Sequence, residues 1–393
     1  MTLDMTTPPR DTAWGLILGI VAVGVGALIV SPLLKDLSTA TGTPVDRMGW
    51  VVAVYGLTLA VTAPPMALWC RSVPRRTLLI AGMALLGAAT VACALASTLG
   101  QLLLARAACG VAAGVFIPSC YAWIGENVPA ERRAQAMGRV MAGWSLALVL
   151  GIPAGGWLAE ALGWRAAFVG VGALAATATW ALRHLPPEAG RGSSPEPIRH
   201  NVGRVATPGP VKVLGINLMN MFAFYACYTY LGWATRDALG VGSGVAGSVV
   251  MCYGIGLMLS TLNGHWLDRI GHRRSLAVAV WCLVLVFAVL PLGLFHLAAL
   301  GGVMVVWGVF QGAAQTCTAT LMARQAPGAQ GLAMACLSAT TYLGVALGAA
   351  AGGWVMPTQG FAAVAAISAV ATAIGGGVVH WLGNERPHRA EAT

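Results

Sequence analysis

The feature that most constrains this chain is a series of long apolar stretches that recurs from one end to the other. We expect spans near 14–34, 49–69, 77–99, 101–124, 138–162 and 164–183, and, after a polar gap, near 212–235, 246–267, 275–294, 297–321, 333–356 and 360–382. Each is about as long as the roughly 20 residues with which a helix crosses a bilayer. Because lipid offers the backbone no hydrogen-bond partners, a spanning segment is a helix or part of a closed barrel. Apolar and polar residues do not alternate along stretch 14–34 as they do in barrel strands. The sequence therefore predicts an all-α membrane protein with twelve transmembrane helices.

The composition agrees with a lipid environment. Of the 393 residues, 58% are apolar and 9% are charged, whereas soluble domains carry about 25% charged residues. A disordered chain is excluded as well, because such chains are poor in apolar residues and rich in charge.

The basic residues are distributed unevenly between the two ends of the predicted spans. With twelve spans, 18 of the 23 Lys and Arg fall on the side of both termini and 4 on the other side, while Arg106 lies inside a span. Basic loops stay on the cytoplasmic side, so we expect a multi-pass protein of the bacterial inner membrane with both termini in the cytoplasm. The net charge of +10 is then a signal of topology. Nucleic-acid binding would need a clustered basic face with stacking aromatics, which the sequence does not contain.

Neither a cleavable leader nor a reactive site is expected. The first apolar run is too long for the apolar region of a signal peptide. The nine cysteines lie almost all inside apolar runs and show no C-x-x-C pair or metal-ligand spacing. Since no nucleophile–base constellation is evident either, we expect no metal, no cofactor and no enzymatic activity.

The chain divides into two similar halves. The segment 184–211 is rich in Pro, Gly and Ser, a composition typical of a flexible linker. We expect a six-helix bundle over 1–183, a cytoplasmic linker over 184–211 and a second six-helix bundle over 212–393. The sequence Ala-Gly-Gly-Trp at 154–157 occurs again 197 residues later, at 351–354. Two parallel six-helix halves are a known plan of membrane transporters.

The loop at 264–274 carries the most specific motif, Gly-His-Trp-Leu-Asp-Arg-Ile-Gly-His-Arg-Arg. It resembles the cytoplasmic-loop signature of the major facilitator superfamily, G-x-x-x-D-R-x-G-x-R-R. Asp268 can accept from the amides of a helix N-terminus, and Arg269 can reach a carboxylate or a helix C-terminus of the other bundle. The resemblance implies that these two residues, with Arg273 and Arg274, form a latch that stabilises the outward-facing state. The alternative is a plain positively charged loop.

The equivalent loop of the first half, 66–76, keeps the basic tail of this motif but has Cys70 or Arg71 in place of the acid. This departure from the family pattern argues against a symmetric latch.

Spans 4 and 5 also resemble this family. The residues are Arg106, Gly110 and Gly114 in span 4, which match R-x-x-x-G with a further glycine, and Gly151, Pro153, Gly155 and Gly156 in span 5, which match the antiporter motif. Together they resemble the drug:proton antiporter and sugar-efflux branch. A charge inside a span usually faces protein or water, so we expect Arg106 to act in coupling or binding; the alternative is that it snorkels to the membrane edge. Small residues in span 5 suit an interface that rocks.

In this superfamily, spans 1, 4, 7 and 10 line a central substrate cavity. The candidate binding residues are Tyr121 in span 4, Asn217, Asn220, Phe224 and Tyr228 in span 7, and Gln311 and Gln315 in span 10. A polar amide within the membrane needs a partner, and either a substrate or a neighbouring helix supplies one. Both interpretations stay open from the sequence.

Proton coupling commonly uses a titratable group at cavity depth, and the sequence places none there. Asp36, Glu160 and Asp268, near span ends, are the remaining candidates. We expect a monomeric secondary transporter, surrounded by membrane lipid, that moves a small molecule by alternating access and exports it in exchange for protons. The alternatives are an importer or facilitator of a small organic anion that pairs with Arg106, and a non-transporting membrane sensor with the same fold.

Overall fold

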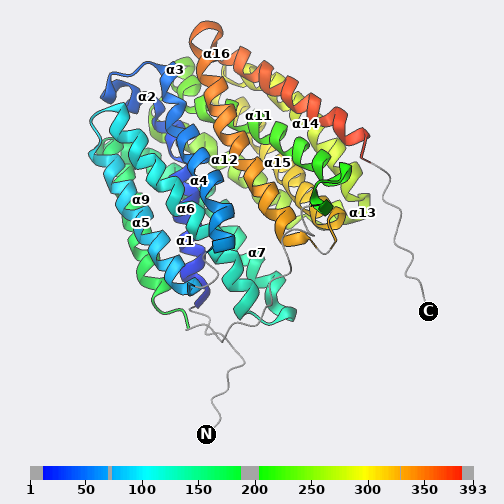
Figure 1. Ribbon diagram of the computed structural model, residues 1–393. Helices are drawn as coiled ribbons and strands as arrows, with labels where there is room; N and C mark the ends of the chain where they lie inside the picture. The colour runs from blue at the N-terminus through cyan, green and yellow to red at the C-terminus, as the bar shows by residue number, and fades with distance from the viewer. Residues whose placement is uncertain (1–11, 70–72, 187–202, 328, 383–393) are drawn as a thin grey trace, which may run out of the picture.

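The computed structural model describes residues 12–69, 73–186, 203–327 and 329–382, and every regular element in these ranges is a helix (Figure 1). In the first half these are α1 (Thr12–Leu28), α2 (Val30–Thr41), α3 (Val45–Met48), α4 (Trp50–Trp69), α5 (Arg75–Leu95), α6 (Leu99–Asn127), α7 (Ala130–Leu146), the π-helix η2 (Ala147–Gly151), α8 (Ile152–Leu162) and α9 (Trp164–Leu182). In the second half they are α11 (Pro208–Leu239), α12 (Ser243–Leu262), α13 (His265–Ile270), α14 (His272–Gly293), α15 (Leu297–Gln325) and α16 (Gln330–His380).

Twelve membrane crossings follow from these helices. Among the described residues, ten helices are long and apolar enough to cross a membrane, and the pair α1–α2, bent by 48°, makes an eleventh. α16 has 51 residues, which at about 1.5 Å per residue is far longer than a bilayer is thick. It consists of two helices that meet at Gly360, where φ is 73°, a backbone conformation that favours glycine. The predicted all-α fold with twelve crossings is confirmed.

The ends of two spans differ from the predicted bounds. The first span was expected to end at residue 34, but after the bend at Ile29 the helix continues to Thr41. The apolar run stops early because α2 is amphipathic, with Leu37 buried and Lys35 half-buried. α11 begins at Pro208, four residues before the expected start of the second half. Most of the expected linker, 187–202, lies outside the described residues.

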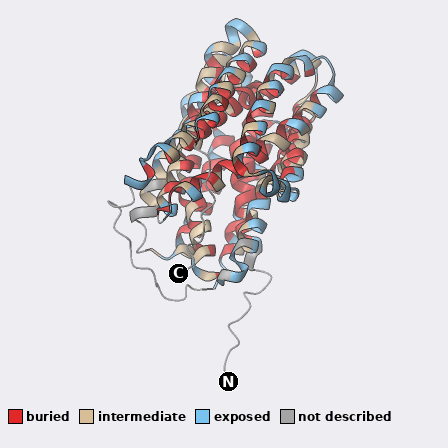
Figure 2. Ribbon diagram, turned by 90° about the vertical axis from the view of Figure 1, so that its right-hand side faces the viewer, coloured by how far each residue is buried: buried red, intermediate tan, exposed pale blue. Residues whose placement is uncertain are grey.

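We call the end of the molecule where α1 begins and α16 ends the basic face, because most Lys and Arg lie there, and the other end the opposite face. Between them, large apolar side chains such as Val61 and Leu285 are 65% exposed, as expected for a surface covered by lipid. Exposed tryptophans lie near both ends: Trp14, Trp180, Trp266 and Trp381 at the basic face, and Trp50, Trp157 and Trp354 at the opposite face. Tryptophan is enriched at membrane–water interfaces. The buried residues lie on the inner sides of the helices (Figure 2).

Equivalent residues of the two halves pack in the same way. A Cβ atom placed on Gly110 of α6 would lie 2.4 Å from the carbonyl oxygen of Tyr55 in α4. A Cβ atom placed on Gly308 of α15 would lie 2.1 Å from the carbonyl oxygen of Tyr253 in α12. Both residues of the second pair stand 198 positions after those of the first. In each half, a glycine therefore brings the equivalent pair of helices, α4 with α6 and α12 with α15, into backbone contact.

Gly308→Ala is expected to destabilise the second bundle, because the added methyl group would meet backbone atoms of α12. Overpacking of this kind costs about 1–3 kcal/mol. The control is Gly302→Ala on the same helix, where nothing lies within 4 Å of the Cβ position. Thermal unfolding of the purified proteins measures the difference. Equal unfolding midpoints for the two variants would contradict the close contact between α12 and α15.

Candidate functional site

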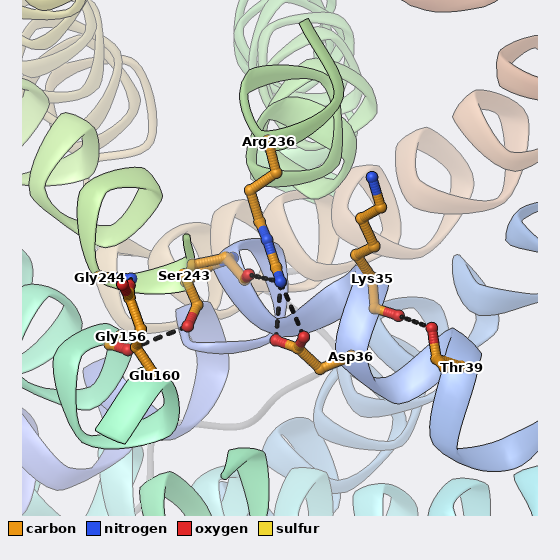
Figure 3. A network of polar contacts seen from close by, with 9 residues as sticks. Lys35, Asp36, Thr39, Gly156, Glu160, Arg236, Ser243 and Gly244 are labelled. Atoms are coloured by element: carbon orange, nitrogen blue, oxygen red, sulfur yellow. Dashed lines mark hydrogen bonds and ion pairs between the residues drawn. The ribbon is translucent and has the colours of Figure 1, made fainter. Parts of the chain in front are cut away.

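The two bundles are joined near the opposite face by ion pairs (Figure 3). Arg236 of α11 donates to both carboxylate oxygens of Asp36 in α2, at 2.7 and 2.8 Å, and also to the carbonyl of Pro32 at 3.1 Å. Beside them, the ammonium of Lys35 lies 3.2 Å from a carboxylate oxygen of Asp237. A bidentate arginine–carboxylate pair is among the stronger polar contacts in proteins, so Asp36 and Arg236 dominate this junction.

A second junction at the same face joins α8 of the first bundle to α12 of the second. The carboxylate of Glu160 accepts from the N–H of Gly244 at 2.8 Å, and the hydroxyl of Ser243 donates to the carbonyl of Gly156 at 3.1 Å (Figure 3). The acid thus lies at the N-terminus of a helix of the other bundle, where the helix dipole favours a negative charge. We call these contacts and the pairs Asp36–Arg236 and Lys35–Asp237 the closure cluster.

The repeated Gly-Gly-Trp motif marks two close approaches between the bundles. A Cβ atom on Gly156 of α8 would lie 2.6 Å from the carbonyl oxygen of Ser243, at the start of α12. A Cβ atom on Gly353 of α16 would lie 2.5 Å from the carbonyl oxygen of Asp46 in α3. The two contacts are related by the offset of 197 residues. Glycine at both positions lets backbones of different bundles touch near the opposite face.

A buried seam continues from the closure cluster toward the middle of the membrane. The hydroxyl of Ser31 in α2 donates to the carbonyl of Tyr228 in α11 and accepts from the N–H of Gly232 at 3.3 Å. The hydroxyl of Tyr228 donates to the carbonyl of Leu28 at 3.1 Å. These four residues are buried, so the seam excludes water between α2 and α11.

Two of the four motif residues at the basic face have partners inside the second bundle. The carboxylate of Asp268 lies 3.3 Å from Nε2 of His272, one turn further along the chain. Arg273 donates to the carbonyl of His380 at 2.8 Å. The other two motif arginines, Arg269 and Arg274, are exposed. In the first half, Cys70 and Arg71 lie outside the described residues.

Arg106 is completely buried in the first bundle, so it does not snorkel to the membrane edge. Its Nη1 donates to the carbonyl of Gly26 at 2.6 Å, and its Nε donates to the carbonyl of Val51 at 3.1 Å. The guanidinium carbon lies 4.5 Å from the ring centre of Tyr55. Nη2 is buried without a hydrogen-bond partner. Arg106 thus ties α6 to α4 and to the last turn of α1 before its bend.

A small cavity lies between the bundles. Its lining residues are Ala27, Val52, Tyr55 and Trp144 from the first half and Tyr225, Tyr342 and Val345 from the second. It has space for about a single water molecule. Tyr55, Trp144 and Tyr342 were not predicted from the sequence. A usable signal was present, because Tyr55 recurs as Tyr253 and Trp144 as Tyr342, both at the offset of 198 that relates the glycines of α6 and α15.

Comparison with known proteins identifies the family. The sequence profile of the Major Facilitator Superfamily matches residues 16–231 and 213–393. The chain belongs to the major facilitator superfamily. Its relatives are transporters. It is 32% identical to the uncharacterized MFS-type transporter YwfA of Bacillus subtilis, over 93% of this chain and 90% of that protein. It is 30% identical to a chloramphenicol efflux pump of Mycobacterium tuberculosis, over 72% of this chain and 69% of that protein.

A solved structure shares the fold of this transporter. It is a bacterial homolog of the human lysosomal transporter Spinster in an inward-facing and unoccupied conformation. The TM-score is 0.72 over 96% of this chain and 95% of that chain, at 16% sequence identity. The likeness shows that the two proteins share one fold.

Among the expected cavity residues of this transporter, Asn217 is held by its own bundle. Its side-chain nitrogen lies between 2.9 and 3.1 Å from three acceptors in α16, namely the carbonyl of Leu337 and the hydroxyls of Thr340 and Thr341. In this conformation the amide acts as a link between helices.

Two other expected cavity residues have unsatisfied amides. Oδ1 of Asn220 and both amide atoms of Gln311 are buried without a partner. One helical turn toward the opposite face, the ring of Phe224 lies 5.2 Å from that of Trp307 and stacks at 5.2 Å on Tyr228. A buried polar atom without a partner is costly, so Asn220 and Gln311 retain hydrogen-bonding capacity that this conformation does not use.

The remaining two expected cavity residues lie nearer the basic face. The hydroxyl of Tyr121 lies 3.1 Å from the sulfur of Met141. Gln315 is exposed. It stands nine residues, or about two and a half helical turns, after the outward-facing Val306, so the two side chains lie on opposite sides of α15. The side of α15 that carries Gln315 is therefore open near the basic face.

The span 5 motif of this transporter packs against the bend of the first span. Cβ atoms on Gly151 and Gly155 would lie 2.2 and 2.5 Å from side-chain atoms of Val25 and Ile29. Pro153, which is buried, lacks the N–H that would bond the carbonyl four residues earlier. The wider π-helical turn η2 stands directly before it and accommodates its ring. In span 4, Gly114 makes the corresponding close contact with Thr62 of α4.

Proposed function

We propose that the protein is an efflux transporter of the bacterial inner membrane, that it works by alternating access, and that it exchanges its substrate for protons. The observation that carries the proposal is one-sided closure. The closure cluster and the seam join the bundles toward the opposite face, while the carboxylate of Asp268 at the basic face pairs with His272 inside its own bundle. A carrier with a central site needs a state that is sealed on one side and open on the other.

The orientation follows from the basic loops. With the basic face in the cytoplasm, the sealed face is periplasmic and the conformation is inward-facing. The exposure of Gln315 on the inner side of α15 fits a water-filled entrance on the cytoplasmic side. Efflux is favoured by the span 5 motif and by the relative that is named a chloramphenicol efflux pump.

The proton coupling is proposed to use the closure cluster. Asp36 and Glu160 are carboxylates that bond across the bundles, and both bonds are lost when this face opens. Each bond is stronger with a negatively charged acceptor, because the carboxylate faces the guanidinium of Arg236 or the N-terminus of α12. Protonation from the periplasm weakens both bonds and therefore favours the open state, and exchange requires that the proton then leave toward the cytoplasm as this face closes.

Transport by inverted membrane vesicles tests the proposal, with radiolabelled chloramphenicol as the probe. An exporter carries the probe into the vesicles when their interior is acidified, and a protonophore stops it. Vesicles without the protein supply the background. Uptake that does not depend on the proton gradient would contradict antiport. Uptake by right-side-out vesicles alone would indicate an importer.

Asp268→Asn tests the proposed latch at the cytoplasmic face. The variant is expected to transport the probe several-fold more slowly, because the neutral side chain binds more weakly to a helix N-terminus or an arginine in the outward-facing state. Its thermal stability is expected to stay unchanged, since the carboxylate is exposed here. Wild-type transport rates in the vesicle assay would exclude the latch.

A further inference from the structure

The central cavity has an aromatic lining that comes from both bundles. Tyr55 and Trp144 face it from the first half, and Tyr225 and Tyr342 face it from the second. Aromatic rings bind flat apolar molecules through stacking and edge-to-face contacts. Because the walls belong to two bodies that move relative to each other, they can part to admit a molecule much larger than the single water for which there is space now.

One polar atom of this lining is ready to bind a ligand. The hydroxyl of Tyr55 is buried and has no hydrogen-bond partner. A buried donor without a partner costs free energy. A ligand with an acceptor atom, such as a nitro, carbonyl, phenolate or carboxylate oxygen, would remove this cost by accepting a hydrogen bond from the hydroxyl.

The electrostatic potential at the cavity is positive, because the nearest charged group is a cation. The guanidinium of Arg106 stands behind the ring of Tyr55, at 4.5 Å, and its Nη2 has no partner. The carboxylates in the described part of the chain lie at the two faces, for example Asp36 in α2 and Asp268 in α13. Charges interact strongly in a medium of low dielectric constant, so an organic cation would meet repulsion here with no acid nearby to offset it.

We propose that the central cavity binds aromatic molecules that are neutral or negatively charged and carry a hydrogen-bond acceptor, and that it rejects organic cations. The hydroxyl of Tyr55 donates to the acceptor, the four aromatic side chains pack on the ring, and Arg106 sets the charge preference. This inference names the substrate class of the proposed efflux function and rests on that function for its biological meaning.

Three probes with one common ring separate charge from shape. We would measure the binding of 4-nitrobenzoate, 4-nitrobenzyl alcohol and 4-nitrobenzylamine to the purified full-length protein in lipid nanodiscs at pH 7, by calorimetry or by saturation-transfer NMR. The anion and the neutral alcohol are expected to bind at least ten-fold more tightly than the cation. Equal or tighter binding of the amine would overturn the proposal.

A single-atom variant tests the role of the hydroxyl. Tyr55→Phe keeps the ring and is expected to weaken binding of the anion and the alcohol by about ten-fold, the effect of one lost hydrogen bond of about 1.4 kcal/mol. Tyr253→Phe is the matched control, because Tyr253 occupies the equivalent position of the second half and does not line the cavity. Equal losses in the two variants, or none in Tyr55→Phe, would overturn the assignment of the donor.

Binding and transport distinguish this inference from the proposed function. Selective binding without any proton-driven transport of chloramphenicol would leave the cavity assignment standing and remove the efflux proposal. Proton-driven efflux together with unselective binding would leave the efflux proposal standing and overturn the cavity assignment.

Discussion

Arg106→Met is expected to reduce transport in inverted vesicles by about 100-fold. The substitution keeps an apolar stem of similar length but removes the hydrogen bonds to the carbonyls of Gly26 and Val51. A hydrogen bond from a charged group contributes about 1.5–3 kcal/mol, and two of them correspond to at least about 100-fold in an equilibrium. Gly26 lies beside the bend between α1 and α2, so the loss also releases the segment that carries the closure cluster.

Arg106→Lys is expected to lie between the wild type and Arg106→Met. An ammonium group is a single point of charge and cannot reach both carbonyls in the way that the planar guanidinium does. Arg139→Met, at an exposed position of α7, controls for the loss of one positive charge. Thermal unfolding of all three proteins separates a folding defect from a transport defect. Transport by Arg106→Met at the level of Arg139→Met would show that the buried charge has no role in the cycle.

Much of the fold follows from the sequence because lipid imposes one strong rule. A backbone without water must bond to itself, so the lengths of the apolar runs predict helices and their number. The same rule says little about helix ends in contact with protein or water. α2 contains Lys35 and Asp36, so its sequence is not apolar enough to be recognised as part of a span. It remains helical because Leu33, Leu34 and Leu37 are buried on its other side.

The candidate site was predicted only in part, because its contacts join residues about 200 positions apart. The sequence names Asp36 as a candidate for coupling but gives no sign of its partner Arg236, which the fold places 2.7 Å away. Asn217 and Asn220 look alike in the sequence, but α16 supplies acceptors to the first and leaves the oxygen of the second unsatisfied. Local pattern cannot separate a satisfied amide from a free one. Repetition at the offset of 198 is the one sequence signal that could have pointed to Tyr55, and it was not used for that residue.

Reversing one charge of the Asp36–Arg236 pair is expected to shift the protein strongly toward the state that is open at the opposite face. Asp36→Arg and Arg236→Asp each place like charges where a bidentate ion pair now stands. Ser31→Cys in the buried seam reports the change, through its labelling by a membrane-impermeant maleimide added to intact cells. Loss of a partly buried charged hydrogen bond of about 1.5 kcal/mol predicts about ten-fold faster labelling. Cells that express the protein without Ser31→Cys supply the background.

The double variant Asp36→Arg with Arg236→Asp distinguishes the pair from the individual charges. Restoring opposite charges is expected to return labelling toward that of the parent protein, because the coupling between contacting residues is not additive. Asp237→Asn is the matched control: its partner Lys35 and Asp237 itself are 38% and 69% exposed, and exposed pairs contribute about 0–1 kcal/mol. If the double variant labels as fast as the single variants, the pair does not hold the bundles together. If Asp237→Asn labels as fast as they do, closure depends on surface charge in general, and Asp36 loses its proposed place in proton coupling.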